Sequence, residues 1–376
     1  MITVEVLDPQ DKPKVRRFLD LPFRLYGRHP QWVPPMLDDV KLMLNRQKHP
    51  FYEHSEAEFF LASQDGKDVG RLAVMENRRY NDFHQKKQAQ FYLFECEDNR
   101  EVAKALFERA FDWARARGLD QCVGPKGFGA LDGYGLLTEG FDQRQMMTMM
   151  NYNFPYYPRL LEALGFEKEV DFASFYVRAD QFKLRPAVHA IAERAVKRGT
   201  FKVLQFRSKQ ELVKKWAKRI GAAYNQAFVA NWEYYPLTDR EIDLLVDNLM
   251  LVVEPHLVKI ITHADQVVGF TFAFADVSAA LQRARGQLWP WVLVDLLLDM
   301  RRTKWVALNG NGILPEYHGL GGNALLYSEM EKTVRGSGFQ HAEFTQIAET
   351  AVQMRQDIEK LGGKLYKNHR VYRRAL

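Results

Sequence analysis

The residues that first suggest chemistry lie in Ile313–Met330, which reads ILPEYHGLGGNALLYSEM. Directly before a predicted helix, this stretch contains three glycines, Gly319, Gly321 and Gly322. The first backbone N–H groups of a helix lack an intrahelical acceptor and lie at the positive end of the helix dipole. Glycines beside them let a ligand approach the backbone, so the stretch predicts an anion site that would fit a pyrophosphate. A tight strand-to-helix turn without a ligand explains the same glycines equally well.

Other chemistries of glycine-rich or metal-binding sequences fit this chain less well. No Gly-Lys-Ser or Gly-Lys-Thr follows the loop, so a Walker phosphate loop is excluded. A dinucleotide-binding fold does not fit either, because the strand before the loop comes late in its half of the chain. The 10 histidines show no metal-ligand spacing and no Cys/His cluster is present, so we expect no bound metal. The Gly-x-Ser-x-Gly motif of a serine nucleophile is also absent.

Two further stretches are candidates for a binding surface. Gly124–Gly135 (GPKGFGALDGYG) follows a predicted strand and is interpreted as a long irregular loop, with a lid or wall of a substrate cleft as the alternative. Gln145–Pro158 (QMMTMMNYNFPYYP) holds four methionines and three tyrosines. Adaptable apolar residues suit a binding surface, although packing in the core explains them as well.

The elements that would position these residues alternate between strand and helix patterns. In the first half, two strand-like runs joined through Asp65 and Gly66 predict a hairpin. A helix over 99–118 is indicated by apolar residues at helical spacing, with Asn99 to cap its start and Gly118 to end it. The remaining predicted elements are strands at 89–97, 120–124 and 171–177 and a short helix at 155–166 in the first half, then a hairpin at 257–276, strands at 303–313, 341–349 and 364–376, and helices at 322–338 and 351–363 in the second.

Both halves therefore share one order: hairpin, strand, helix, strand, helix, strand. The shared order predicts an internal duplication, and the mixture of elements predicts an α/β fold with mixed, mostly antiparallel sheets flanked by helices. A length of 376 residues suits two domains, which we place at 1–180 and 181–376.

The composition is that of a soluble globular chain, with 47% apolar and 27% charged residues. The net charge of +6 permits an anionic ligand, and no clustered stripe of lysine and arginine indicates a nucleic-acid partner. Cys96 and Cys122 are expected to be buried free thiols in a reducing compartment. Because the N-terminus shows no signal peptide, we expect a cytoplasmic protein.

The most apolar stretch is Leu288–Met300, LWPWVLVDLLLDM. It contains Pro290 and two aspartates, and it falls short of the ~20 apolar residues that a membrane span needs. It therefore predicts a buried amphipathic helix, and we expect no membrane partner.

The stretch ILPEYHGLGGNALL resembles the acetyl-CoA pyrophosphate loop of the GNAT acyltransferase superfamily, whose pattern is Gln/Arg-x-x-Gly-x-Gly/Ala. Gly319 and Gly321 match its two small positions, whereas Glu316 stands where the superfamily usually has Gln or Arg. The order of elements in both halves is similar to that fold, and the chain as a whole looks like a poorly characterised group with two GNAT domains. The resemblance implies tandem GNAT-like acyl-CoA N-acyltransferase domains.

The same resemblance implies acetyl-CoA or another acyl-CoA as co-substrate, bound by the second half. The backbone amides of Leu320 to Asn323 would hold the pyrophosphate, and the strand end near Ile313 and Leu314 would splay open and pair with the pantetheine arm. The implied cofactor-binding residues are Ile313, Leu314, His318, Gly319, Leu320, Gly321, Gly322 and Asn323.

The first half departs from this pattern at the equivalent strand-to-helix junction, FECEDNREVAKAL. The junction has no glycine and carries three acids, Glu95, Glu97 and Asp98, which would repel a pyrophosphate. We therefore predict that the first domain does not bind CoA in the manner of the family.

Acyl transfer from a thioester to an amine needs a neutral amine, a donor for the developing oxyanion and a proton for the leaving thiolate. In the superfamily a tyrosine on the last helix often protonates the thiolate, and that position is Ile358 here, so the usual acid is absent. Tyr366 and Tyr372 are aromatic alternatives, although a role in the core or the sheet fits them better.

Two candidate catalytic residues remain. Glu349 follows the fifth strand, near where the fold places the reacting centre, and Asn311 lies on the cofactor strand together with Asn309, where either could orient a water. A solvated surface position explains Glu349 as well, and capping of a turn explains the asparagines. No base is needed where the amine has a low pKa.

Aromatic residues in Asn231–Pro236 (NWEYYP) precede the second hairpin, where members of the superfamily place residues that face the substrate. Trp232, Tyr234 and Tyr235 are therefore candidates for the wall of a substrate pocket.

Three functions are consistent with the sequence. The first is an N-acyltransferase acting on a small-molecule or peptide amine, with the first domain shaping the acceptor site. The second is a non-catalytic protein that binds acyl-CoA or a partner, which the isoleucine at 358 and the acid at 316 favour. The third is an aminoacyl transferase that uses charged tRNA, as some proteins with two GNAT domains do.

Overall fold

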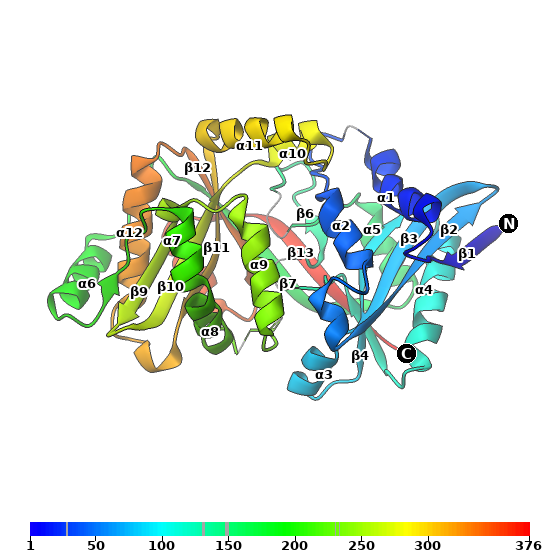
Figure 1. Cartoon of the computed structure of the whole chain (residues 1–376), viewed down its shortest axis with the longest axis horizontal. Coiled ribbons are helices and arrows are strands. Elements are labelled where there is room, and N and C mark those ends of the chain that lie inside the picture. Colours follow the sequence, from blue (N-terminus) through cyan, green and yellow to red (C-terminus); the bar gives the residue numbers. More distant parts are fainter. Residues whose placement is uncertain (28, 130–131, 147–149, 230, 233) are drawn as a thin grey trace. The chain divides into compact units, whose positions relative to one another are not determined.

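The computed structural model describes residues 1–27, 29–129, 132–146, 150–229, 231–232 and 234–376 (Figure 1). These residues form two compact units. Unit 1 comprises Met1–Ala173, Ser278–Leu296 and Tyr366–Leu376, and unit 2 comprises Ser174–Val277 and Leu297–Leu365. The second half of the chain thus contributes two segments to unit 1, an exchange that the predicted domains 1–180 and 181–376 do not contain.

Unit 1 is built on a mixed sheet in the order β1-β2-β3-β4-β5-β13-β7, with β6 paired to β13. Its strands are β1 (Ile2–Val6), β2 (Glu56–Gln64), β3 (Lys67–Glu76), β4 (Gln88–Cys96), β5 (Gln121–Gly124), β6 (Leu136–Glu139), the first part of β7 (Glu167–Arg178) and most of β13 (Lys364–Ala375). Its helices are α1 (Lys12–Tyr26), α2 (Leu37–Leu44), η1 (Pro50–Glu53), α3 (Arg78–His84), α4 (Arg100–Arg115), α5 (Tyr156–Ala163), α10 (Ser278–Ala284) and the first half of α11 (Pro290–Arg302).

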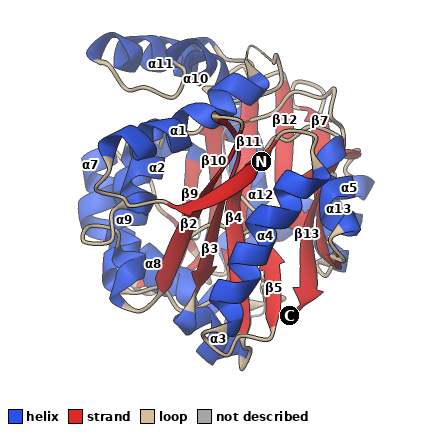
Figure 2. Cartoon of the chain, turned by 90° about the vertical axis from the view of Figure 1, so that its right-hand side faces the viewer, coloured by secondary structure: helices blue, strands red, loops and turns tan. Residues whose placement is uncertain are grey.

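Helix α4 shows why the local sequence folds as predicted. The side chain of Asn99 accepts hydrogen bonds from the backbone N–H groups of Glu101 and Val102, which caps the start of the helix. Figure 2 shows α4 lying across the strands of unit 1. Its apolar face, including Leu106 and Phe107, packs into the core on this side of the sheet. A second core on the α1 side includes Phe18 and Phe59, so the sheet is covered on both faces.

Unit 2 is built on a sheet in the order β7-β12-β11-β10-β9-β8. Its own strands are β8 (Lys202–Val203), β9 (Val258–His263), β10 (Gln266–Ala275), β11 (Trp305–Ile313) and β12 (His341–Ala348). Its helices are α6 (Pro186–Lys197), α7 (Lys209–Glu211), η2 (Leu212–Trp216), α8 (Ala217–Ala227), α9 (Asp239–Met250), η3 (Pro255–Leu257), η4 (Pro315–Tyr317), α12 (Gly322–Gly336) and α13 (Val352–Lys360).

The two units repeat one arrangement, which confirms the expected internal duplication. In unit 1, β3 pairs antiparallel with β2 and β4, and β4 pairs parallel with β5 after the crossover through α4. In unit 2, β10 pairs antiparallel with β9 and β11, and β11 pairs parallel with β12 after the crossover through α12. In both units, the strand that follows the crossover helix therefore pairs in parallel with the strand that precedes that helix.

The apolar stretch Leu288–Met300 forms a helix, α11, as predicted, but the expectation that this helix is buried is wrong. Val292, Leu296 and Met300 are buried, whereas Trp291 is 66% and Val294 is 58% exposed. The sequence shows that both sides of the helix are apolar, and it does not show that only one side has something to pack against. Within the described ranges, every helix is too short or too polar to cross a membrane.

Candidate functional site

Strand β11 separates from its parallel neighbour partway along its length. The parallel pairing with β12 begins at Trp305 and His341 and ends at Leu308 and Phe344. On its other edge, β11 stays paired with β10 as far as Ile313. Over residues 309–313, β11 therefore has one edge on which the described part of the chain places no paired strand. Backbone groups on such an edge can bond to an extended ligand.

The same part of β11 contains a bulge. Asn311 pairs with Thr271 and Leu308 pairs with Ala273, so Asn309 and Gly310 together lie opposite one residue of β10. Gly310 has a φ of 86°, in the left-handed region that glycine adopts without strain. A bulge leaves a residue outside the ladder and turns its backbone groups away from the neighbouring strand. It lies where β11 leaves β12, so these groups are placed at the opening.

The glycine stretch forms the turn into α12. Gly321 is the N-cap, with a φ of 92°, and its carbonyl accepts the first helical hydrogen bond from Leu325, 3.0 Å away. The N–H groups of the first turn therefore have no intrahelical acceptor. A Cβ on Gly321 would lie 3.1 Å from the side chain of Ile191, and one on Gly322 would lie 3.0 Å from the side chain of Ile313.

Close packing of α12 against its neighbours thus accounts for Gly321 and Gly322. This agrees with the interpretation that the glycines form a tight strand-to-helix turn without a ligand. Packing does not account for Gly319, where a Cβ would have nothing within 4 Å, although its φ of 77° still favours glycine. His318 connects the turn to the end of β11, because its Nε2 lies 3.0 Å from the carbonyl oxygen of Ile313. Leu320 is 50% exposed and Glu316 is exposed, so the outer side of the turn is open to solvent.

Asn311 connects the strand to the helix. Its Nδ2 donates to Oδ1 of Asn323 at 3.2 Å and to the hydroxyl of Tyr327 at 3.4 Å. Asn323 and Tyr327 are four residues apart, so they lie on the same side of α12. Burial raises the pKa of Tyr327 to about 12, so its hydroxyl keeps its proton at neutral pH. The sequence analysis missed Tyr327, because its spacing from Asn323 places both on one side of α12 but does not show that this side faces Asn311.

The other positions considered for catalysis lie on several different elements. Glu349 lies half-buried in the turn after β12. Ile358 is buried, at 4% exposure, on α13. Tyr366 and Tyr372 both belong to unit 1, where the hydroxyl of Tyr372 donates to Glu162 at 3.3 Å. The preference for a sheet or core role is confirmed for Tyr372, which lies in the core beside α4.

The predicted substrate-facing aromatic residues are largely engaged within unit 2. The hydroxyl of Tyr234 donates to the backbone carbonyl of Asn225 at 2.7 Å, and that of Tyr235 donates to Glu241 at 2.9 Å. Both rings are buried, and Trp232 is half-buried. Glu233, within the same stretch, lies outside the described residues. A role for these three aromatic residues in binding stays a prediction.

Unit 1 has the same bulge in β4. Arg71 pairs with Glu95 and Ala73 pairs with Tyr92, so two residues of β4 again lie opposite one residue of β3. Leu93, the first of these two residues, has a φ of 51°, whereas in β11 the second residue, Gly310, has the positive φ. Positive φ at a leucine is uncommon, so the bulge of β4 forms although the side chain disfavours that backbone conformation.

The edge that is open in β11 is closed in β4. The hydroxyl of Tyr157 accepts from the backbone N–H of Cys96 at 3.1 Å, and the hydroxyl of Tyr156 donates to the Cys96 carbonyl at 2.7 Å. Tyr157 also donates to Glu95 at 2.7 Å. Burial raises the pKa of Glu95, so this carboxyl is easier to protonate than an exposed one. Side chains from α5 thus occupy the backbone groups that an extended ligand would need.

The N-terminus of α4 is occupied as well. The Oδ1 of Asn99 accepts from Glu101 at 3.0 Å and from Val102 at 3.3 Å, where a pyrophosphate would need those donors. Glu97 forms an ion pair with Arg24 at 2.6 Å. Asp98 forms an ion pair with Arg159 at 2.8 Å. These contacts support the prediction that unit 1 does not hold CoA as the second half would.

The loop Gly124–Gly135 folds back beside β4 in unit 1. The N–H of Lys126 donates to the carbonyl of Phe91 at 2.9 Å, and the N–H of Gly135 donates to the carbonyl of Pro125 at 2.9 Å. Residues 130–131 of this loop and 147–149 of the methionine-rich stretch lie outside the described residues. No cluster of three or more potential metal ligands occurs among the residues that the structure describes.

Comparison with known proteins identifies the fold. No protein-family model matches the chain. A tandem GNAT protein from the clavulanic acid biosynthesis pathway superposes with a TM-score of 0.57 and 13% identity, covering 100% of this chain and 98% of that one. A GCN5-related N-acetyltransferase from Anabaena variabilis superposes with a TM-score of 0.54 and 9% identity, covering 100% of this chain and 72% of that one. The chain therefore has the tandem GNAT fold that its sequence predicts.

Two curated proteins match along nearly the whole sequence. One is "Bacterial ceramide synthase" from Caulobacter vibrioides, 28% identical over 381 residues that cover 99% of this chain and 98% of that protein. The other is "Protein YghO" from Escherichia coli, 23% identical over 375 residues that cover 97% of this chain and 94% of that protein. Both relatives therefore align with both units rather than with one domain.

Proposed function

We propose that this chain is an N-acyltransferase that moves a fatty acyl group from acyl-CoA to the amine of a long-chain sphingoid base, giving a ceramide. The observation that carries the proposal is the alignment with bacterial ceramide synthase, 28% identical across 99% of this chain. The tandem GNAT fold supports the reaction class, since the structural neighbour from Anabaena variabilis is named an N-acetyltransferase.

The proposed acyl-CoA site is the open edge of β11 together with the first turn of α12. The pantetheine arm would pair with the edge of β11 over residues 310–313, beyond the point where the parallel ladder has ended. The pyrophosphate would lie against the N–H groups of Leu320 to Asn323, at the positive end of the helix dipole. The backbone N–H of Gly310, in the bulge, would stabilise the oxyanion that forms on the thioester carbonyl.

The proposed reaction forms one bond and breaks one. The neutral amine attacks the thioester carbonyl, the C–N bond forms, and the C–S bond breaks to release the CoA thiolate. We assign the proton for that thiolate to the hydroxyl of Tyr327, which lies one helical turn from Asn323 on the side of β11. Glu349, after β12, stays the proposed acceptor of the proton that the amine loses.

The experiment that tests the proposal combines turnover with binding. The purified protein is incubated with sphinganine and either palmitoyl-CoA or acetyl-CoA, and the N-acyl product is measured by mass spectrometry. We expect a long-chain N-acyl product and release of free CoA. Binding of acyl-CoA without any product would instead favour the non-catalytic acyl-CoA-binding protein, and salt-sensitive binding of charged tRNA without acyl-CoA binding would favour the aminoacyl transferase.

A charge change at Asn323 tests where the CoA lies. Asn323 is exposed in the first turn of α12. The negative charge introduced by Asn323→Glu would interact favourably with the positive end of the helix dipole, so the fold should stay intact while the pyrophosphate is repelled. Asn323→Gln is the matched neutral control. We expect at least ~10-fold weaker CoA binding by calorimetry for the glutamate variant only. Equal affinities for both variants would place the CoA elsewhere.

A further inference from the structure

Helix α11 carries apolar side chains that the fold leaves uncovered. Val292, Leu296 and Met300 recur every four residues and are buried, so one side of the helix packs against the protein. The other side presents an exposed apolar surface, which comprises Trp289 (52% exposed), Trp291 (66%), Leu293 (38%), Val294 (58%), Leu297 (50%) and Leu298 (39%). Exposed apolar side chains gathered on one element in this way indicate a docking surface.

Two tryptophans lead this surface. The rings of Trp289 and Trp291 are stacked, with centroids 5.6 Å apart and planes 5° apart, and both are more than half exposed, so we call them the tryptophan plate. Indole rings are enriched where a protein meets the interface between lipid and water, because the ring is apolar and its N–H is polar. A stacked pair at the start of an exposed apolar helix fits that environment.

The charges around the exposed apolar surface are arranged to favour an anionic partner. Arg301 and Arg302 form the last turn of α11, and both are exposed. The two carboxylates of the helix are half-buried, and that of Asp295 is paired with Arg283 at 2.9 Å. The exposed side of α11 is therefore apolar along its length and basic at its C-terminal end.

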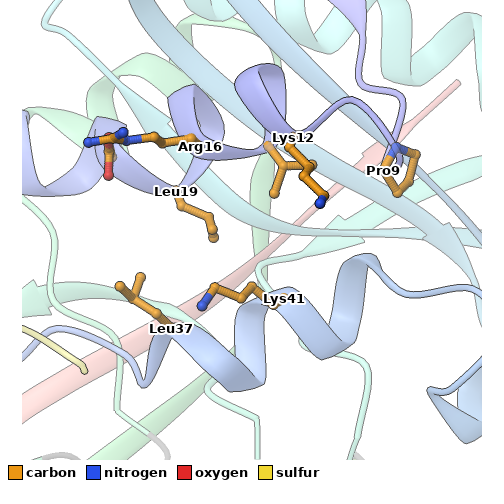
Figure 3. Close-up of a pocket in the computed structure, with 8 residues that line it drawn as sticks. Pro9, Lys12, Arg16, Leu19, Leu37 and Lys41 are labelled. Carbon is orange, nitrogen blue, oxygen red and sulfur yellow. The ribbon is translucent and has the colours of Figure 1, made fainter. Parts of the chain in front are cut away.

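A groove in unit 1 has the same combination of apolar and basic side chains. It has a volume of about 350 Å³ and lies between α1 and α2, with Pro9, Val15, Leu19 and Leu37 as its apolar lining and Lys12, Arg16, Lys41 and Asp20 at its sides. Arg16 pairs with Asp20 at 3.4 Å and Lys41 pairs with Asp38 at 2.9 Å, and the three basic groups of the lining outnumber its one carboxylate. Figure 3 shows Leu19 and Leu37 directed towards each other across the gap, with Lys12 and Lys41 beside them. Such a groove suits an amphiphilic anion, with the chain on the leucines and the anionic group near the lysines.

The groove adjoins the start of α11 within unit 1. The N–H of Leu37, the first residue of α2, donates to the carbonyl of Gly286 in the α10–α11 turn at 2.9 Å. A Cβ on Gly286 would lie 2.2 Å from the carbonyl oxygen of Pro35, so this contact tolerates only glycine. Arg285, in the same turn, lies over the ring of Phe23 at 5.3 Å. The turn that leads into α11 is thus fixed to the α1–α2 side of unit 1.

We propose that the exposed apolar surface of α11, with the basic groove beside it, docks this protein on the surface of a bilayer that contains anionic lipids. The tryptophan plate and the leucines would enter the interface between headgroups and acyl chains, and Lys12, Arg16 and Lys41 would face the anionic headgroups. The choice of a bilayer over another protein rests in part on the proposed function, whose acceptor and product are membrane lipids.

This proposal differs from the expectation that the chain has no membrane partner. That expectation rested on the length of Leu288–Met300, which is too short to span a bilayer. A helix that lies in the plane of the interface has no such length requirement, because only one face enters the lipid. The partial exposure of α11 is therefore what a helix of this kind should show.

Vesicle binding tests the proposal without any substrate. The full chain is mixed with vesicles of phosphatidylcholine alone or with about 30% phosphatidylglycerol, and the bound fraction is measured by co-sedimentation and by the blue shift of tryptophan fluorescence. We expect binding to the anionic vesicles, weaker binding to the neutral ones, and at least ~10-fold weaker partitioning for the double variant Trp289→Ser/Trp291→Ser.

Matched variants separate docking from general surface effects. Val352→Ser/Leu365→Ser removes two apolar side chains on α13 and β13 that are 57% and 49% exposed, and it should bind vesicles as the unchanged chain does. Lys12→Glu/Lys41→Glu should weaken binding to anionic vesicles and leave binding to neutral ones unchanged. Circular dichroism of each variant verifies that the fold is intact.

Two outcomes would overturn the proposal. One is the absence of binding of the unchanged chain to both kinds of vesicle. The other is a dimer in analytical ultracentrifugation that the tryptophan double variant dissociates, which would make the surface a contact between two copies. Because vesicle binding is measured without acyl-CoA or amine, it can fail while acyl transfer succeeds, and the reverse result is equally visible.

Discussion

Gly310 of β11 and Leu93 of β4 lie in two equivalent bulges, at neighbouring positions. Leu93 is the first and Gly310 the second of the two residues that lie opposite one residue of the adjacent strand, and their φ values are positive, 51° and 86° respectively. Both units have therefore kept a bulge that contains a residue of positive φ, while the surroundings of the bulge have diverged. Around Gly310 the strand edge is open, whereas around Leu93 it is closed by the tyrosines of α5.

The first prediction concerns the bulge of unit 2. Gly310→Ala should destabilise the fold by about 1–2 kcal/mol, because alanine resists positive φ and its Cβ would lie 3.3 Å from the ring of Phe272. It should also lower the rate of acyl transfer, since the bulge is the proposed oxyanion site. The control is Gly336→Ala at the end of α12, where a Cβ meets nothing within 4 Å; it should be neutral or slightly stabilising. Urea denaturation gives both values, and equal stabilities of the two variants would contradict the strained backbone.

The second prediction concerns the acid in the glycine turn. Glu316 is exposed three residues before Gly319, and its negative charge opposes the binding of a pyrophosphate nearby. Glu316→Gln should strengthen CoA binding about 2–10-fold in calorimetric titrations at low salt, and the gain should shrink as salt screens the charge. Glu359→Gln, an exposed glutamate on α13, is the control and should change the affinity little. Weaker binding by the Glu316 variant would show that this carboxylate contributes to the site directly.

The third prediction concerns the closed edge of unit 1. Tyr157→Phe removes the acceptor of the Cys96 N–H and one of the two hydroxyl donors to Glu95, so it should cost about 2–3 kcal/mol of unfolding free energy. Tyr156→Phe removes a single donor to the Cys96 carbonyl and should cost about 1 kcal/mol. Thermal denaturation of the two variants is the measurement. A larger loss for the Tyr156 variant would mean that the network around Glu95 contributes little.

Much of this fold follows from local sequence patterns, and the exceptions have physical reasons. The hairpin turn at Asp65 and Gly66 and the cap of α4 at Asn99 involve neighbouring residues, so a short window of sequence contains all of their determinants. The membership of Tyr366–Leu376 in unit 1 depends on pairing with strands more than 200 residues away, such as Tyr372 with Gly124. A strand pattern gives no sign of which distant partner it will pair with.

The candidate site was predictable to a similar extent. The glycine turn before α12 follows from residue types and spacing. Asn311 was predicted to orient a water or to cap a turn, and its hydrogen bond to Asn323 on α12 was not predicted. The position of Tyr327 beside Asn311 depends on how α12 crosses β11, which spacing alone does not fix. The exposure of α11 was missed because an apolar pattern records what a helix can bury and not whether a partner covers it.

The fourth prediction concerns a buried histidine on β13. His369 is fully buried, its Nε2 lies 2.9 Å from the carbonyl of Asn151, and burial lowers its pKa to about 4 from 6.5. Between pH 6.5 and pH 4 the unfolded chain therefore binds a proton that the folded chain does not, so acid removes stability in this window. His369→Gln keeps a side-chain donor for Asn151 and does not titrate. The unchanged protein should lose about 3 kcal/mol relative to this variant over that range, measured by urea denaturation at successive pH values. Stability curves that stay parallel from pH 7.5 to 4.5 would mean that His369 titrates normally in the folded chain.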